Sequence, residues 1–291
     1  MEYLFLSITV ILCAAQNIFI KQYNIKTQKP DPLLFGAVTV LFALLFFVAD
    51  SGIEYGFKFS FSTEILPYSI SFALTYSMAI IGAILAIKLG SLAVSALISS
   101  YSLIIPTFYG VFFLGEKLSY TGFVLLCISI FLINKKDEQS TVRFTPGWVI
   151  ALIALFSGNG LCSTVQKIQQ LAFKERLYSY KNEFMIISLF ISCIILFLAW
   201  AVSTKGKTPQ KSVLKNSFRY GLPRGLANGM VNMLMLTLAG KIDATVLYPT
   251  VSAGGIVLGF FVATLWYKEK LSKTQLSGYC IGLASVIMLN M

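Results

Sequence analysis

Long apolar segments without any charged residue follow one another along the chain, separated by short polar stretches. A transmembrane helix needs about 20 predominantly apolar residues, and ten segments of roughly this length occur. They span residues 3–20, 32–49, 65–87, 89–115, 118–134, 144–166, 184–204, 225–240, 244–267 and 274–291. We expect the eighth helix to begin earlier, near Phe218, and so to include Arg224. The pattern predicts an all-α integral membrane protein with ten transmembrane helices.

The second half of the chain repeats short pieces of the first. The tetrapeptide Glu-Lys-Leu-Ser at residues 116–119 recurs at residues 269–272, an offset of 153 residues, and an offset of 146 residues relates Lys21 to Lys167. These matches predict two units of five helices each, residues 1–136 and 146–291. Because five is odd, the second unit enters the membrane from the opposite side. Such inverted repeats are typical of transporters, in which a central cavity opens to either side in turn.

Composition agrees with a membrane protein and limits its partners. The 291 residues are 57% hydrophobic and 12% charged, whereas soluble domains carry about 25% charged residues. The net charge of +11 comes from basic residues in short loops, where lipid headgroups and topology explain them, so we expect no nucleic acid partner. The expected partners are a small-molecule solute and membrane lipids, with the chain a monomer or a homodimer.

Metal and cofactor chemistry has little support in the sequence. There is no histidine, and the five cysteines all lie inside apolar segments, where they are expected to be small packing residues. We therefore expect no metal, no cofactor and no catalytic residues. A membrane-embedded enzyme is the least favoured class, because a general base is hard to find.

The chain resembles the EamA-type transporters of the drug/metabolite transporter (DMT) superfamily. The residues that carry the resemblance are the Ala-Ile-Lys at 86–88, Ile105-Pro106, the Gly-Glu-Lys-Leu-Ser at 115–119 and the second copy at 267–272. The resemblance covers essentially the whole chain. It implies a ten-helix bundle whose cavity is built mainly by the first four helices of each half, with the last helix of each half toward the outside. One departure is that Pro106 has no equivalent at Gly259.

Polar residues inside the apolar segments are the candidates for solute binding. Arg224, Asn228 and Asn232 stand at i, i+4 and i+8, which places them on one helical face. Gln16 and Asn17 in the first segment and Asn159 in the sixth are further candidates. Polar groups in a bilayer usually face a partner or a water-filled cavity. In the alternative interpretation the amides only bond neighbouring helices, while Arg224, Lys21 and Lys167 extend to lipid headgroups.

Tyrosines and helix-breaking residues complete the candidate set. Tyr76 and Tyr101 lie near the middle of the third and fourth segments, where a hydroxyl needs a partner, and we expect both to line the cavity. Tyr248 is expected in the aromatic belt at the membrane interface. The breakers Pro106, Pro249, Gly254 and Gly255 lie in the fourth and ninth segments. They are candidate hinges for gating, or static bends that serve packing.

The distribution of charge narrows the function. No Asp or Glu lies near the middle of any segment, so proton-driven export of cations by a buried carboxylate is disfavoured. The sequence predicts a secondary transporter that moves an anionic, zwitterionic or neutral polar metabolite by alternating access. A lipid- or amphiphile-handling bundle, or a purely structural one, is the alternative.

The expected location is a bacterial inner membrane, with multiple passes, but the sequence gives two opposite orientations. Lys and Arg concentrate in the odd-numbered loops, and the positive-inside rule would place those loops in the cytoplasm and both termini outside. The family resemblance implies cytoplasmic termini instead. Both orientations stay open at this point.

Overall fold

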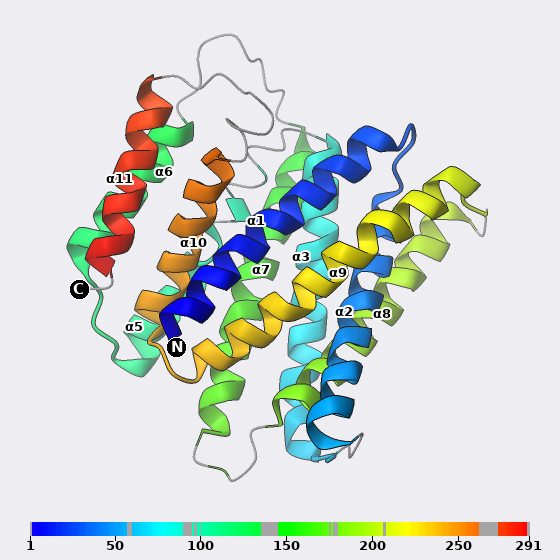
Figure 1. The fold of residues 1–291 in the computed structure, drawn as a ribbon, viewed down its shortest axis with the longest axis horizontal. Helices are drawn as coiled ribbons and strands as arrows, with labels where there is room; N and C mark the ends of the chain where they lie inside the picture. Colours follow the sequence, from blue (N-terminus) through cyan, green and yellow to red (C-terminus); the bar gives the residue numbers. More distant parts are fainter. Residues whose placement is uncertain are drawn as a thin grey trace.

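A computed structural model describes residues 2–56, 60–89, 95, 98–99, 101–134, 145–174, 176, 180–205, 208–261 and 273–289. Within these residues the fold is all-α and contains no strand, as the sequence predicts. The helices are α1 (Glu2–Lys26), α2 (Pro32–Tyr55), η1 (Thr63–Ile65), α3 (Leu66–Leu89), α5 (Ile104–Leu114), α6 (Tyr120–Asn134), α7 (Pro146–Ala172), α8 (Lys181–Thr204), α9 (Lys211–Ala239), α10 (Ala244–Phe261) and α11 (Lys273–Leu289). Figure 1 shows them as one bundle of steeply crossing helices.

Local signals in the sequence set several helix ends. Asp31 caps α2 by accepting a hydrogen bond from the Leu34 backbone N–H at 3.1 Å, and Pro32 follows as the first helical residue. Thr145 and Pro146 begin α7 in the same way. A side-chain oxygen at the cap satisfies one free N–H, and proline is preorganised for the first turn.

Two expected helices differ from the structure. Helix α9 begins at Lys211, seven residues before Phe218, so that part of the polar stretch between the seventh and eighth segments is helical. The first turns of α9 contain basic residues, so the apolar pattern does not predict this extension. The expected continuous helix over residues 89–115 is interrupted by a turn at Ser102 and Leu103, after which α5 begins.

Helices from the two sequence halves alternate in the packing. Helix α1 contacts α9 and α10, and α7 contacts the corresponding helices of the first half, α3 and α5. In the same way α2 contacts α9, and α8 contacts α3. Three further contacts pair equivalent helices directly: α2 with α8, α5 with α10, and α6 with α11. Helices α6 and α11 form one edge of the bundle, opposite α2 and α8 (Figure 1).

Hydrogen bonds that link helices to neighbouring loops and helix ends mark two ends of the bundle. At the first, the Asp31 end, Trp200 donates to the Asp31 carboxylate at 2.9 Å and Asn216 donates to the Lys26 carbonyl at 3.0 Å. At the second, the Ile242 end, Lys167 donates to the Ile242 carbonyl at 2.7 Å. The Ser60–Glu183 bond and the Arg176–Glu64 ion pair join loops at this second end too.

The outer surface of the bundle is rich in large apolar side chains. Phe112 and Phe113 of α5 are 75% and 76% exposed, and Val202 of α8 is 78% exposed. Many large exposed apolar side chains are unfavourable in water and are compatible with helices that face lipid. Within the described residues, α1, α2, α3 with η1, α7 and α8 are each long and apolar enough to cross a membrane, judged by length and composition.

Candidate functional site

Polar side chains from four helices meet in the middle of the bundle. They are Gln16 of α1, Tyr76 of α3, Gln166 of α7, and Asn228 and Asn232 of α9, and we call these five residues the amide cluster. Tyr76, Gln166 and Asn232 are buried, whereas Gln16 and Asn228 are half-buried. Helices α1 and α3 come from the first half of the sequence, and α7 and α9 come from the second. Both halves therefore contribute to the cluster.

A continuous set of hydrogen bonds links the amide cluster. Asn228 is its centre: its Oδ1 accepts from the Tyr76 hydroxyl at 2.6 Å, and its Nδ2 donates to Gln16 Oε1 at 3.0 Å. Asn232 donates through Nδ2 to Asn228 Oδ1 at 3.1 Å, and accepts from Gln166 Nε2 at 3.0 Å. Amides carry both donors and acceptors, so the same groups could exchange these bonds for a polar solute.

Arg224 lies one turn from Asn228 on α9, toward the Asp31 end. Its guanidinium donates to the Thr39 hydroxyl of α2 at 3.2 Å and lies over the Phe35 ring, 5.2 Å from the ring centroid. Its Nε is buried and has no hydrogen-bond partner among the residues that the structure describes. Within the described part of the chain, no carboxylate lies within ion-pair distance of Arg224. A half-buried cation with a hydroxyl and a ring for neighbours is suited to hold an anionic group.

Two other predicted residues form a separate site around the turn that precedes α5. Asn159 of α7 donates through Nδ2 to the Ser102 hydroxyl at 2.6 Å and to the Ser99 carbonyl at 3.2 Å. Its amide therefore satisfies backbone and hydroxyl groups freed by the break before α5. Tyr101 directly precedes this turn and is half-buried. The structure thus places Asn159 and Tyr101 apart from the amide cluster.

Asn17 also stands outside the cluster. Its side chain is exposed on α1, whereas the neighbouring Gln16 turns inward to Asn228. Consecutive residues on a helix are about 100° apart, so only one of the two can face the centre of the bundle.

The predicted hinge residues occupy different kinds of position. The sequence predicts that Pro106 interrupts the interior of a long helix. It lies instead in the first turn of α5, where proline costs little. Pro249 does lie inside α10. A Cβ added to Gly254 would come within 2.8 Å of Val10, so Gly254 lets α10 approach α1 closely, whereas Gly255 has nothing within 4 Å of that position.

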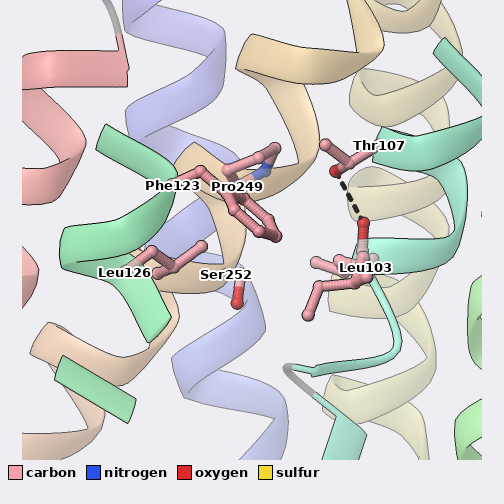
Figure 2. Close-up of a pocket in the computed structure, with 7 residues that line it drawn as sticks. Leu103, Thr107, Phe123, Leu126, Pro249 and Ser252 are labelled. Carbon is pink, nitrogen blue, oxygen red and sulfur yellow. Dashed lines mark hydrogen bonds between the residues drawn. The ribbon is translucent and has the colours of Figure 1, made fainter. Parts of the chain in front are cut away.

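A small apolar gap lies between α5, α6 and α10, next to the break before α5 and to Pro249. Figure 2 shows Leu103, Thr107, Phe123, Leu126, Pro249 and Ser252 around it, with Thr107 donating to the Leu103 carbonyl at 2.8 Å. The gap has room for about one water molecule. It is too small for a metabolite.

Two expectations about interface residues are wrong. Lys167 does not extend to headgroups: it is buried and its Nζ lies 3.4 Å from Oε1 of Glu116, a buried ion pair between the two sequence halves. Tyr248 is not a belt residue, because it is fully buried and donates its hydroxyl to the Ser163 carbonyl at 2.8 Å.

The apolar pattern predicts neither the place of Gln166 in the amide cluster nor the pairing of Glu116 with Lys167. The missed signal is the polar stretch Thr164–Gln170, whose members Gln166, Lys167, Gln169 and Gln170 are all buried. The charge on Lys167 predicts the end of a span at Gln166, whereas the helix continues to Ala172. Within the described ranges, no group of three or more His, Cys, Asp or Glu side chains could hold a metal ion.

Fold and site together define an all-α bundle with an apolar outer surface and a polar cluster at its centre. Comparison with known proteins adds a fold match. A solved structure described as "Crystal structure of protein" is similar with a TM-score of 0.72 and 14% sequence identity, covering 99% of this chain and 95% of that one. At this identity the likeness shows the fold alone. No protein-family model and no curated protein matches the chain.

Proposed function

We propose that the chain is a secondary transporter that moves a small polar metabolite across the membrane by alternating access. The single observation that carries this proposal is the amide cluster, in which four helices from both halves direct exchangeable donors and acceptors to one central point. A purely structural bundle has little need of such a cluster, because interhelical hydrogen bonds in membranes add only about 0.6 kcal/mol each.

The architecture that we propose is ten transmembrane helices in two inverted repeats, residues 1–136 and 146–291. The exchange of contacts supports it: α1 relates to α9 and α10 as α7 relates to α3 and α5. Such reciprocal packing is expected when two similar units face each other around an axis in the membrane plane. The second copy of the Glu-Lys-Leu-Ser motif, at residues 269–272, lies outside the described residues. The EamA-type resemblance and a bacterial inner membrane are part of the same proposal.

The charges favour an anionic, zwitterionic or neutral solute. Arg224 is the charged group nearest to the centre of α9, and it lacks a carboxylate partner among the described residues. A solute carboxylate or phosphate at Arg224 would place the rest of the molecule one helical turn away, at Asn228. A cation would find no compensating carboxylate there within the described ranges.

The test is thermal unfolding of the purified, full-length chain in liposomes, screened against small polar metabolites. A solute that binds the folded state stabilises it by about 2.7 kcal/mol when its concentration is 100 times its Kd, and Tm rises accordingly. We expect Asn228→Ala to abolish the shift and Asn17→Ala, which changes the same side-chain type outside the cluster, to leave it intact. Stabilisation by lipids or amphiphiles alone would support the lipid-handling alternative.

A further inference from the structure

A buried ion pair joins the two halves of the chain at the Ile242 end. Lys167 Nζ of α7 lies 3.4 Å from Glu116 Oε1 and donates to the Ile242 carbonyl at 2.7 Å. The second carboxylate oxygen of Glu116 accepts from the Thr245 N–H, in the first turn of α10, at 3.0 Å. The side chains of Lys167 and Glu116 are only 4% and 8% exposed. One carboxylate thus binds α7 and the start of α10 together.

The local sequence directs Glu116 into this position. Helix α5 ends at Leu114, and Gly115 takes a left-handed conformation with φ 65°, after which the Glu116 N–H donates back to the Gly110 carbonyl at 3.0 Å. This reversal is a common glycine-dependent helix ending. Gly110 is needed for a second reason, because a Cβ there would collide with the Glu116 carboxylate and come within 2.9 Å of Ala244 Cβ.

The ion pair lies next to the amide cluster. Lys167 directly follows Gln166, the α7 member of the cluster, and Tyr248 bonds to α7 one turn away at Ser163. Glu116 directly follows the end of α5 and is also bonded to α10, a helix with Pro249 in its interior; the small gap in Figure 2 lies between α5, α6 and α10. Bending of α5 or α10 would therefore move Glu116 away from Lys167 on α7.

The energetics suit a contact that opens and closes. A buried ion pair gains little relative to its two hydrated charges, because desolvation offsets most of the attraction. If water enters this end of the bundle, both charges are hydrated and the loss of the pair costs little. Breaking the pair by removing one charge while the other stays buried is costly, so such a variant favours the state in which the remaining charge meets water.

We propose that Glu116 and Lys167 form a latch that closes the Ile242 end of the central cavity and separates when that end opens. The proposal depends on the proposed alternating-access function, since a latch has a role only if the two ends open in turn. In this arrangement the Glu116–Lys167 contact holds one end shut, and removal of the Glu116 charge alone destabilises the closed state.

The test uses Cys162 of α7, which is 6% exposed and lies one turn before Gln166. The other four cysteines, Cys13, Cys127, Cys193 and Cys280, are replaced by alanine, and the labelling rate of Cys162 by an impermeant maleimide is measured from each side of the membrane. Glu116→Gln keeps an oxygen for Thr245 and removes only the charge. We expect it to raise the rate about tenfold, and only from the side on which Lys241→Cys is labelled.

Matched variants separate the latch from general loosening. Glu64→Gln breaks the Arg176 ion pair at the same end, where both side chains are about half exposed, and should not change the rate. The double variant Glu116→Gln/Lys167→Gln should raise the labelling rate of Cys162 by less than the sum of the two single effects, because both changes act on one ion pair. Gly110→Val displaces the Glu116 carboxylate sterically and should raise the labelling rate of Cys162 as Glu116→Gln does. With two variants, the test can still be made if one of them does not fold.

An unchanged rate in folded Glu116→Gln and Gly110→Val proteins, or an equal rise from both sides, would overturn the latch. The labelling needs no solute, so its outcome is independent of the metabolite screen. One-sided opening without any stabilising metabolite would retain the latch and refute the proposed substrate class. A stabilising metabolite without one-sided opening would retain transport and refute the latch.

Discussion

Tyr76 donates its hydroxyl to Asn228 at 2.6 Å across the contact between α3 and α9. Tyr76→Phe removes this bond without changing the volume of the ring. We expect the free energy of unfolding to fall by about 0.6 kcal/mol, the average worth of such a bond between helices in a membrane. Chemical unfolding in detergent measures it, with Tyr120→Phe on the exposed face of α6 as the control. A Tyr76→Phe protein as stable as the parent would show that Asn228 finds another donor.

Arg224 is the residue at which stability and binding should change in opposite directions. A guanidinium half-buried without a carboxylate loses hydration on folding. We therefore expect Arg224→Gln to leave Tm unchanged or to raise it, while the affinity for an anionic solute falls at least about tenfold, as for a lost charged hydrogen bond. Titration of the Tm shift against solute concentration reports both quantities.

Arg219→Gln is the matched control for Arg224, since Arg219 lies on the same helix but is exposed and packs over the neighbouring Tyr220 ring. It should change neither quantity. If neutral and anionic solutes lose affinity equally in Arg224→Gln, Arg224 acts through the shape of the site and the anionic assignment is wrong.

Among the helices, α9 depends on glycine for its approach to α2. A Cβ on Gly225 would lie 2.5 Å from both the Phe42 Cβ and the Thr39 carbonyl oxygen, and backbone atoms cannot move aside cheaply. We expect Gly225→Ala to lower the free energy of unfolding by about 1–3 kcal/mol, as overpacking does. Gly255→Ala meets nothing within 4 Å and should stabilise α10 by about 0.5–1 kcal/mol, the usual gain in helix propensity. In thermal unfolding, Tm should fall in Gly225→Ala and rise in Gly255→Ala relative to the parent.

The elements are the most predictable level of this molecule, because the length of an apolar run alone predicts a helix. Charged residues are less informative. The pattern predicts a loop at Lys211 and Lys215, which instead begin α9, and a helix end near Lys167, which instead pairs inside the bundle with a carboxylate from the other half. A charge in an apolar sequence can mark a boundary or a buried pair, and the partner that decides between them is distant in sequence.

The site was predictable in part for the same reason. The i, i+4 spacing of Asn228 and Asn232 predicts that both share one face of α9, and in the structure both belong to the amide cluster. Choosing Gln16 over Asn17 required the rotation of α1, which only its contacts with α9 determine. Asn159 is on the right helix, but its amide is used by the break before α5, which the unbroken apolar pattern concealed.

At the scale of the whole molecule, the proposed inversion makes equivalent ends of the two repeats face opposite sides. Lys26 is the last residue of the first helix of one repeat, and Lys174 follows the first helix of the other. Lys26 is bonded through its carbonyl to Asn216 at the Asp31 end, whereas Arg176, two residues after Lys174, pairs with Glu64 at the Ile242 end. Single cysteines at Lys26 and Lys174 in a cysteine-free background should therefore be labelled from opposite sides of the membrane.

The same experiment decides the orientation when α9 supplies the probes. Lys211 and Lys241 lie exposed near its two ends, so each variant to cysteine reports one side through a single helix. The basic residues at the start of α9, with those near Lys26, concentrate positive charge at the Asp31 end. Positive residues in short loops are retained on the cytoplasmic side, so we expect impermeant reagent outside intact cells to label Lys241→Cys and to spare Lys211→Cys. The Ile242 end, with its Glu116–Lys167 pair, would then face outward. The reverse labelling would place the Asp31 end outside, and would mean that packing between the repeats determines insertion against the charge distribution.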